Sequence, residues 1–540
     1  METTKQPEGR KYDYIIIGSG SAALTVGALL ANAGKTVCML EAHDIPGGYA
    51  QNFKWGDFYF CGQVHYIWGC APGGTVYEFL KKLGLEKDIT FELHDADGYD
   101  RMSMPDGKVV KIPYGYDRLA ENIEAAYPGQ KGAVIKFTNI LDKIGGEMQR
   151  YPDKEIRWWQ YITQGWKYLT LLKYKDSTLQ DVFNECGLSK EAQLVICAQA
   201  GDFMEPPERL SIFAFIGLFA GYNGGAYYPT KHYKYYVDRL AQFIAEHRGC
   251  KVFLSHEVTK VNFEGDRAVS VETKNGKVFT GANIICNADP RKTAEMIGLD
   301  KFPADYRKKL DYTYSPSGIM IYLGLKNADL RKKGFGGFNI WHCEGDDMNQ
   351  MWREMGAGDF SKPWVFLSTP TLHTSERGTV APADCDIMEI AAYTEFEWLD
   401  ELRKKDYKAY EAKKLEIADR MIDIMAKRFF PDLRNYIVTK VVGSPSTNVH
   451  WVNAPKGNAY GASITPSQMG PGRLKAKSPW KNFFWCNATA GYGGVHGTVS
   501  TGVGLYMELT SDKFYDESKM PTNAEKAIHA REAFEKGVRA

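Results

Sequence analysis

The sequence predicts an α/β protein built from two interleaved units, one on a parallel sheet covered by helices and the other on a mixed or antiparallel sheet. Three observations support this prediction. A strand–turn–helix–strand pattern opens the chain at residues 12–41. A second α/β stretch lies near residues 225–300, and a strand before a glycine-rich helix returns at 480–512. No Pro/Gly/Ser-rich linker separates these stretches, and 540 residues are enough for two domains.

The opening pattern is that of a dinucleotide-binding, Rossmann-like βαβ unit. The β-forming residues 14–17 end at Gly18, and a tight turn through Gly20 leads into an apolar helix. The next strand, 37–40, delivers Glu41. Gly18 permits the sharp turn, and Gly20 lets a pyrophosphate approach the backbone because it has no side chain. Glu41 is placed to accept hydrogen bonds from ribose hydroxyls.

The start of the predicted helix supplies the groups that hold phosphate. Ser21 and Ala22 open this helix, and the free N–H groups of a first helical turn carry a partial positive charge. Ala23 stands where a third glycine is usual, and its small side chain keeps helix and strand close. The charge of Glu41 repels a 2′-phosphate, which argues against NADP. An ordinary buried βαβ unit is the alternative interpretation.

A second glycine turn decides between NAD and FAD. Gly47, Gly48 and Tyr49 follow only a few residues after Glu41. The ribityl chain and ring of a flavin continue past the pyrophosphate and require such a backbone cradle, whereas NAD does not. A plain Pro-Gly-Gly turn is the alternative. No other G-x-G-x-x-G pattern follows a strand and opens a helix, so we expect FAD and no second fold for NAD(P)H.

These patterns predict how the chain divides. We expect a Rossmann-like FAD-binding domain from residues 10–85, 225–300 and 480–512, interleaved with an α+β substrate domain from 86–224 and 301–479. Residues 513–540 are expected to form a charged helical tail on the surface. Finer expectations are a β-ribbon at 53–69, a hairpin within 89–112, separate strands at 277–280 and 283–287, and a helix starting near Thr498.

Two apolar stretches in the substrate domain bear on its partners. Residues 156–174 mix three tryptophans and three tyrosines with Arg157, Lys167 and Lys173. This composition suits either an amphipathic helix at a membrane surface or a helix packed within the protein. Residues 210–221 are almost wholly apolar, and form either a buried helix or the wall of an apolar substrate tunnel.

The composition argues against several classes of protein. The chain has 67 basic and 66 acidic residues, a net charge of +1, so nothing points to nucleic acid. Its ten cysteines lack a C-x-x-C pair or a dense framework, which suits free thiols in a reducing compartment. The polar start predicts no cleavable signal, and the longest apolar run, 212–220, is too short to span a bilayer. We expect a cytoplasmic protein, soluble or peripheral on a membrane.

The chain resembles a known family along nearly its full length. The motifs that carry the resemblance are GSGSAALTVGALLANAGKTVCMLE-x(5)-GG, VHYIWG at 64–69, NAPKGNAYGA at 453–462, and the C-terminal glycine turn and helix. They are similar to the phytoene desaturase, carotenoid isomerase and retinol saturase group of FAD-dependent oxidoreductases, within the amine oxidase superfamily. The second and third motifs look most like the carotenoid isomerase and retinol saturase branch.

The resemblance implies further cofactor-binding residues. Val258 occupies the position where the family's backbone contacts adenine, and Ala288 follows the strand that completes the FAD domain. Asn487, Gly494 and Val495 lie in the C-terminal turn that suits the flavin pyrimidine edge and ribityl chain. The chain departs from the branch at three places near the predicted ring, which puts the branch's reaction, though not FAD binding, in question. The departures are Cys61, Gln63 and the pair Asn487-Ala488.

The candidate catalytic residues lie beside the predicted ring. His65 is a candidate polar group, with Tyr66 next to it, and His496 lies in the C-terminal glycine turn. Each histidine has an alternative role as a structural imidazole bonded to backbone. Tyr460 is a candidate for the channel wall. No Ser-His-Asp order or metal-spaced His/Cys cluster occurs, so we expect no metal.

The leading hypothesis is an FAD enzyme that desaturates, saturates or isomerises C–C and C=C bonds of a long apolar polyene, retinoid or isoprenoid-type lipid. Its partners are then an apolar lipid-like substrate, an unknown electron donor or acceptor and a membrane surface. Two alternatives stay open. One is an amine oxidase-like enzyme, and the other is a flavin-bound protein that binds lipid without catalysis.

Overall fold

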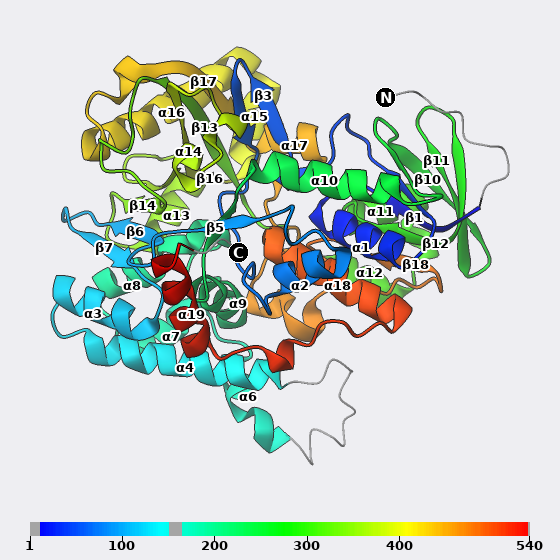
Figure 1. The fold of residues 1–540 in the computed structure, drawn as a ribbon, viewed down its shortest axis with the longest axis horizontal. Helices are drawn as coiled ribbons and strands as arrows, with labels where there is room; N and C mark the ends of the chain where they lie inside the picture. The colour runs from blue at the N-terminus through cyan, green and yellow to red at the C-terminus, as the bar shows by residue number, and fades with distance from the viewer. Residues whose placement is uncertain (1–10, 151–164, 538–540) are drawn as a thin grey trace.

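The computed structural model describes residues 11–150 and 165–537 (Figure 1). Two sheets lie side by side in this view, each with its own helices, and a group of helices fills the lower left. The stretch predicted at 156–174 is therefore described only from residue 165 onward. No helix in the described residues is long and apolar enough to cross a bilayer.

The first sheet has a parallel core in the order β9-β2-β1-β12-β18. Its strands are β1 (Lys11–Ile17), β2 (Val37–Leu40), β9 (Lys251–Phe253), β12 (Val278–Cys286) and β18 (Phe483–Trp485). Strand β11 (Arg267–Thr273) pairs antiparallel with the first residues of β12, and β10 (Val258–Glu264) pairs antiparallel with β11. Three distant parts of the chain thus meet in one sheet, which supports the predicted interleaving; the domain boundaries stay predictions.

Helices pack on the core because β2 and the last four residues of β1 are apolar and buried. Helix α1 (Ser21–Asn32) is the central one: eleven of its twelve residues are buried, and it packs against α10 (His232–Glu246) and α18 (Gly494–Thr510). Helix α2 (Thr75–Leu83) contacts both α1 and α18. On the opposite face lie α11 (Pro290–Ile297) and α12 (Ala304–Leu310).

The second sheet has seven strands in the order β17-β13-β16-β15-β14-β6-β7, and β14–β6 is its parallel pair. The strands are β6 (Asp100–Ser103), β7 (Val109–Ile112), β13 (Ser317–Lys326), β14 (Asn339–Cys343), β15 (Trp364–Ser368), β16 (Cys385–Thr394) and β17 (Ile437–Gly443). Its associated helices are α13 (Met348–Gly356), α14 (Pro370–His373), α15 (Phe396–Lys405), α16 (Tyr407–Phe429) and α17 (Pro445–Val452). The predicted mixed or antiparallel sheet is confirmed.

Short elements join the two sheets. A hairpin of β3 (Asn52–Trp55) and β4 (Phe58–Cys61) precedes the loop that carries the candidate catalytic residues, and β5 (Phe91–Leu93) pairs with β8 (Tyr227–Pro229). The helical group comprises α3 (Tyr116–Ala126), α4 (Lys131–Gln149), α6 (Leu169–Tyr174), α7 (Leu179–Cys186), α8 (Lys190–Ile196), α9 (Ile212–Asn223) and α19 (Asn523–Glu535).

The structure corrects four finer expectations. The strands predicted at 277–280 and 283–287 form one strand, β12, because its first half pairs with β11 and its second half with β18. Helix α18 begins at Gly494, four residues before Thr498. The predicted ribbon ends at Cys61, before the loop to residue 69. The C-terminal tail is not purely a surface helix, since Ala527 and Ala530 are buried and α19 packs against α9.

Candidate functional site

The turn after β1 has the geometry that a pyrophosphate requires. Gly18 has a φ of +91°, which favours glycine, and Gly20 caps α1. A Cβ on Gly20 would lie 2.5 Å from Asn287 Oδ1, so only glycine fits there. The Gly20 N–H donates to this Oδ1 at 3.0 Å. Sequence analysis missed Asn287, although its position directly after a parallel strand is where ligands of such sheets bind.

The first turn of α1 carries groups that suit phosphate oxygens. Ser21 and Ala22 belong to that turn, whose N–H groups have no partner within the helix. The buried Ser21 Oγ has no hydrogen-bond partner among the described residues. The buried hydroxyl of Tyr236, from α10, lies near Ser21 and is also without a partner in the part of the chain that the structure describes. Orphaned buried donors at a helix N-terminus fit an anion.

Glu41 lies half-buried at the end of β2, as predicted. Its Oε2 accepts the Ser19 N–H at 2.8 Å and the Ser19 hydroxyl at 2.6 Å, while Oε1 accepts the His43 N–H at 2.8 Å. A carboxylate has about four acceptor positions. One position on Oε1 therefore remains for a ribose hydroxyl, one fewer than the two hydroxyl bonds that the sequence suggested.

The second glycine turn packs directly on the first. Gly47 has a φ of +118° and donates its N–H to Ser19 O at 3.1 Å. Gly48 has a φ of +57°, and a Cβ there would lie 3.2 Å from Gly20 Cα. Tyr49 points elsewhere: its hydroxyl donates to the carbonyl of Asn458 and lies 3.4 Å from that of Gly457, both in the 453–462 loop. The two turns form one continuous backbone cradle, which fits FAD.

The remaining cofactor candidates lie around this cradle in different ways. Val258 is half-buried at the start of β10, and Ala288 is exposed next to Asn287. Asn487 is buried and uses its amide within the protein, since Nδ2 donates to Ala288 O and Oδ1 accepts from Ala490 N, both at 3.0 Å. Gly494 and Val495 form the first turn of α18. Asn487 thus shapes the turn through its side chain.

A buried arginine that sequence analysis missed lies under the C-terminal turn. Arg473 donates to the carbonyl of Ala488 at 2.6 Å and to that of Gly491. Burial lowers the pKa of its guanidinium to about 10. Lone arginines in Gly/Pro-rich loops carry no sequence pattern, so only the fold brings this cation beneath residues 488–491.

A column of four rings connects the start of α18 with the loop after β4. His496 stacks on Trp68 with centroids 4.4 Å apart, and Trp68 meets Tyr222 edge-on at 4.8 Å. Tyr222 stacks on Tyr66 at 4.0 Å and an angle of 8°. Burial, followed by the charge of Lys526, lowers the pKa of His496 to about 3, so this imidazole is neutral. The structure thus joins two of the predicted catalytic residues, His496 and Tyr66, through rings.

His65 faces the second sheet instead. Its Nδ1 lies 3.0 Å from Oε2 of Glu389, a fully buried carboxyl in the middle of β16. The imidazole also packs on Phe366 with centroids 4.6 Å apart. Sequence analysis missed Glu389, because it lies in an apolar strand 324 residues after His65. Tyr66, the next residue, turns toward two further carboxyls, Asp100 and Asp202.

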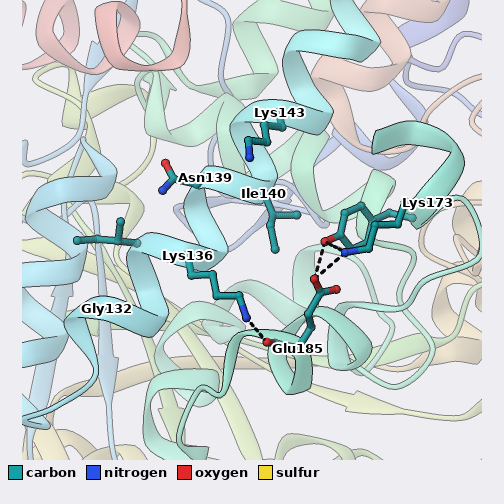
Figure 2. Close-up of a pocket in the computed structure, with 9 residues that line it drawn as sticks. Gly132, Lys136, Asn139, Ile140, Lys143, Lys173 and Glu185 are labelled. Carbon is teal, nitrogen blue, oxygen red and sulfur yellow. Dashed lines mark hydrogen bonds and ion pairs between the residues drawn. The ribbon is translucent and has the colours of Figure 1, made fainter. Parts of the chain in front are cut away.

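A surface pocket lies apart from these groups. It has a volume of about 470 Å³ and is lined by α4, α6 and Glu185 of α7 (Figure 2). Lys136 and Lys173 both turn toward Glu185, and Lys173 Nζ lies 2.7 Å from its Oε1. None of the candidate residues lines this pocket. Helices α4 and α1 lie in different parts of the molecule (Figure 1), so the pocket is not the cofactor site.

The cradle, the ribose carboxylate and the returning C-terminal helix define an FAD-dependent oxidoreductase. The chain belongs to the flavin containing amine oxidoreductase family, whose sequence model matches residues 24–504. The resemblance found in the sequence and the expectation of FAD are therefore confirmed, and the protein is related to carotenoid isomerases and retinol reductases.

Three similar proteins illustrate the relationship. Chloroplastic prolycopene isomerase 1 of an Oncidium hybrid cultivar is 25% identical over 473 residues, which cover 85% of this chain and 77% of the relative. All-trans-retinol 13,14-reductase of Danio rerio is 21% identical over 500 residues, which cover 87% and 81%. The solved structure of putrescine oxidase bound to putrescine has a TM-score of 0.63 at 14% identity, and covers 93% of this chain and 99% of its own. At that identity the last comparison concerns the fold alone.

Proposed function

We propose that this flavoprotein changes carbon–carbon double bonds of a long apolar lipid, such as a polyene, retinoid or isoprenoid, by desaturation, saturation or isomerisation. The similarity to a prolycopene isomerase and a retinol reductase over more than four-fifths of the chain supports this proposal. When bound, FAD supplies the hydride chemistry that such reactions need. The protein's part is to hold the alkene, exclude water and move one proton.

The observation that carries the proposal is the apolar accessible face of α9. One side of this helix is buried, through Phe215, Phe219 and Tyr222. The other side keeps accessible surface and consists of apolar residues at helical spacing, namely Phe213, Ala214, Gly217, Leu218 and Gly221. A Cβ on Gly221 would lie 2.3 Å from Trp68 Nε1, so this face ends against Trp68 and the ring column. An uncharged surface that leads to the site suits a hydrocarbon chain.

The same face disfavours the amine alternative. A protonated amine would have to pass an uncharged wall, and burying an unpaired charge costs several kcal/mol. The two enzyme classes can be separated directly. Purified holoprotein with reduced flavin is mixed anaerobically with a polyene, and holoprotein with oxidised flavin is mixed in air with an amine panel. We expect flavin reoxidation and a changed polyene; amine-dependent flavin reduction with peroxide formation would overturn the proposal.

The candidate residues receive proposed roles. The glycine cradle, Ser21 and Glu41 hold the nucleotide half of FAD, and Gly494 with Val495 contacts its other end. His65, which is held by Glu389, and His496, whose neutral ring stacks on Trp68, line the region where the substrate reacts. Tyr66 takes part through the two carboxyl groups that its hydroxyl contacts, those of Asp100 and Asp202.

We also propose that the protein draws its substrate from a membrane surface. Helix α6 and the turn before it expose apolar side chains: Trp166 is 68% exposed, Leu169 63% and Leu172 46%. Lys167 and Lys173 lie on the same short segment. Exposed apolar groups beside cations suit an anionic bilayer. In Figure 1, α6 lies at an outer edge of the molecule.

A further inference from the structure

Two carboxyl groups share the hydroxyl of Tyr66. The Tyr66 oxygen lies 2.7 Å from Asp202 Oδ2 and 3.1 Å from Asp100 Oδ2. Gln199 Nε2 completes the cluster, at 2.8 Å from Asp100 Oδ2 and 3.2 Å from the Tyr66 oxygen. Gln199 and Asp202 lie three residues apart in the short helical segment Ala198–Asp202, which is kinked at Gln199. Asp100 begins β6.

If both carboxyl groups were ionised, the phenol and the Gln199 amide would offer three hydrogens for the four contacts of the cluster. The cluster therefore needs one more proton. The phenol has one hydrogen and can donate to only one of the two carboxyls. Gln199 Nε2 has two hydrogens, one for Asp100 and one for the phenol oxygen. The contact between Asp202 and the phenol oxygen is then satisfied when Asp202 carries the proton and donates it to Tyr66. Asp100, with two donors, is the partner that ionises first.

Electrostatics supports the same placement. Burial and then the nearby charge of Asp100 raise the pKa of Asp202 well above its usual range. Burial also raises the pKa of Asp100, to about 7, and its hydrogen bonds moderate the rise. Two like charges bridged by one hydroxyl cannot both ionise cheaply in a buried site, so the pair holds a proton at neutral pH.

The proton lies beside the candidate site. Asp100 is fully buried, whereas Asp202 keeps accessible surface. Asp202 lies near Tyr222, in the ring column, and near Tyr460. A Cβ on Gly493, which caps α18, would lie 2.9 Å from Tyr460 Cβ. Asp202 is therefore on the side of the cluster that faces the end of α18 and the ring column.

We propose that Asp202 is the acid that delivers a proton to the alkene, with Asp100, Tyr66 and Gln199 as its positioning residues. This inference rests on the proposed function and deepens it. Saturation adds a hydride, from the reduced cofactor, to one carbon and a proton to the other. Rotation of the Asp202 carboxyl turns its O–H bond away from Tyr66. That bond breaks, its electron pair stays on the carboxylate, and the π electrons form the new C–H bond.

The proposal also favours a direction. A residue that starts neutral can give a proton at once, whereas desaturation needs an ionised base. Addition to a double bond, either as net saturation or as the first half of an isomerisation, is therefore favoured over net desaturation. Water that reaches the accessible side of Asp202 restores the proton after each turnover.

Infrared spectroscopy of the FAD-loaded protein tests the proton without any substrate. At neutral pH we expect a carboxylic-acid carbonyl band that shifts in D2O and vanishes in Asp202→Asn. Asp176→Asn, at an exposed aspartate of the surface, should keep the band. Tyr66→Phe should keep the band but move it, since the carboxyl loses the phenol. Wild-type protein without the band, or a band that survives in Asp202→Asn, would overturn the assignment.

Turnover in D2O then tests the transfer. With a polyene and reduced flavin, wild-type protein should place two solvent deuteriums on the product for each double bond saturated, one with the hydride, because the N5–H of reduced flavin exchanges with solvent, and one as the proton. Asp202→Asn should slow this step by about 10²-fold or more while binding FAD and undergoing photoreduction normally. If the wild type changes no polyene, the proposed function is wrong. The infrared experiment still tests separately whether Asp202 is protonated. If the variant keeps its rate within about twofold, the assignment of Asp202 as donor fails.

Discussion

Asn287 receives the backbone N–H of Gly20 on its side-chain oxygen, although the two residues are 267 positions apart. The nitrogen of the same amide donates to the carbonyl of Cys486 at 2.5 Å. One side chain therefore ties the turn after β1 to the ends of β12 and β18. The pyrophosphate turn is held by parts of the chain that meet only in the folded sheet.

Asn287→Ala should loosen this turn. The variant leaves the Gly20 N–H and the Cys486 carbonyl without their partner, which costs about 1–3 kcal/mol per buried group. We expect a lower free energy of unfolding in denaturant and weaker FAD binding by flavin fluorescence. Asn283→Ala, on strand β12 just before Asn287, is the matched control, because its amide donates to the carbonyl of the exposed Asp13. Unchanged FAD affinity in Asn287→Ala would contradict this role.

Two glycines of α9 form a natural pair for testing the apolar face. A methyl group at Gly217 meets nothing within 4 Å, whereas at Gly221 it would overlap the Trp68 ring. Gly217→Ala should stabilise the protein by about 1 kcal/mol, because alanine favours a helix. Gly221→Ala should displace Trp68 from His496, change tryptophan fluorescence and lower polyene turnover at least tenfold, in line with what a 1 Å misplacement costs (about 10²-fold). Equal turnover in the two variants would show that the substrate does not run along this face of α9.

The sequence was informative where one local pattern contains the whole signal. Gly18, Gly20, Glu41, Gly47 and Gly48 lie within 31 residues, and their order alone predicts the cradle that the structure contains. The second sheet was also predictable, because its strands β13, β15 and β16 are almost wholly buried and mostly apolar. The start of α18 was placed too late, since glycines at 493, 494 and 497 resemble a loop until the fold shows them packed on the site.

The chemistry around Tyr66 and His65 was not predictable in the same way. Asp100, Asp202 and Glu389 come from three separate elements, and each looks like a surface residue or an interruption of a strand in the sequence. Their meaning arises from burial: a carboxyl without water must find a partner or a proton. Asn487 lies in a motif that the sequence singled out, and the structure adds that its side chain also holds the turn.

The carboxyl pair should make stability depend on pH in a defined window. Burial raises the pKa of Asp100 from 3.8 to about 7 in the folded state, so the folded protein binds more protons than the unfolded chain between these values. Stability should therefore fall as pH rises from about 4 to 7, by up to about 4 kcal/mol at about 1.4 kcal/mol per unit.

Asp100→Asn removes this ionisation and should flatten the curve. Denaturant unfolding at pH 5 and pH 8 should show a smaller difference in the variant than in the wild type. Asp97→Asn serves as the control because Asp97 is exposed and paired with Arg118. A wild-type protein that gains stability between these two pH values would contradict the sign.

The exposed apolar side chains near α6 should bind membranes. Liposomes containing anionic lipid should carry the wild-type protein upward in a density gradient, and the triple change Trp166→Ser, Leu169→Ser, Leu172→Ser should leave it at the bottom. Trp55→Ser, which alters another exposed tryptophan on β3, should float like the wild type. If the triple variant also floats, these three side chains do not make the membrane contact.

Two substitutions of Glu389 should separate a structural role of His65 from a role in proton transfer. Glu389 is fully buried, its Oε2 contacts His65 Nδ1 at 3.0 Å, and its Oε1 has no hydrogen-bond partner in the described residues. Glu389→Ala leaves His65 without its partner and should cost about 3–5 kcal/mol of folding stability. Glu389→Gln keeps an acceptor for His65 and removes only the charge, so most of this stability should return.

If His65 moves a proton in the reaction, Glu389→Gln should still lower kcat about tenfold or more, with unchanged FAD affinity. This factor lies below the usual contribution of a proton-transfer group, because the amide introduced by Glu389→Gln still holds the imidazole. Glu395→Gln, one residue beyond the same strand and bonded to Tyr393, is the matched control. If Glu389→Gln recovers both stability and kcat, the imidazole only supports the loop, and proton transfer rests with the carboxyl pair alone.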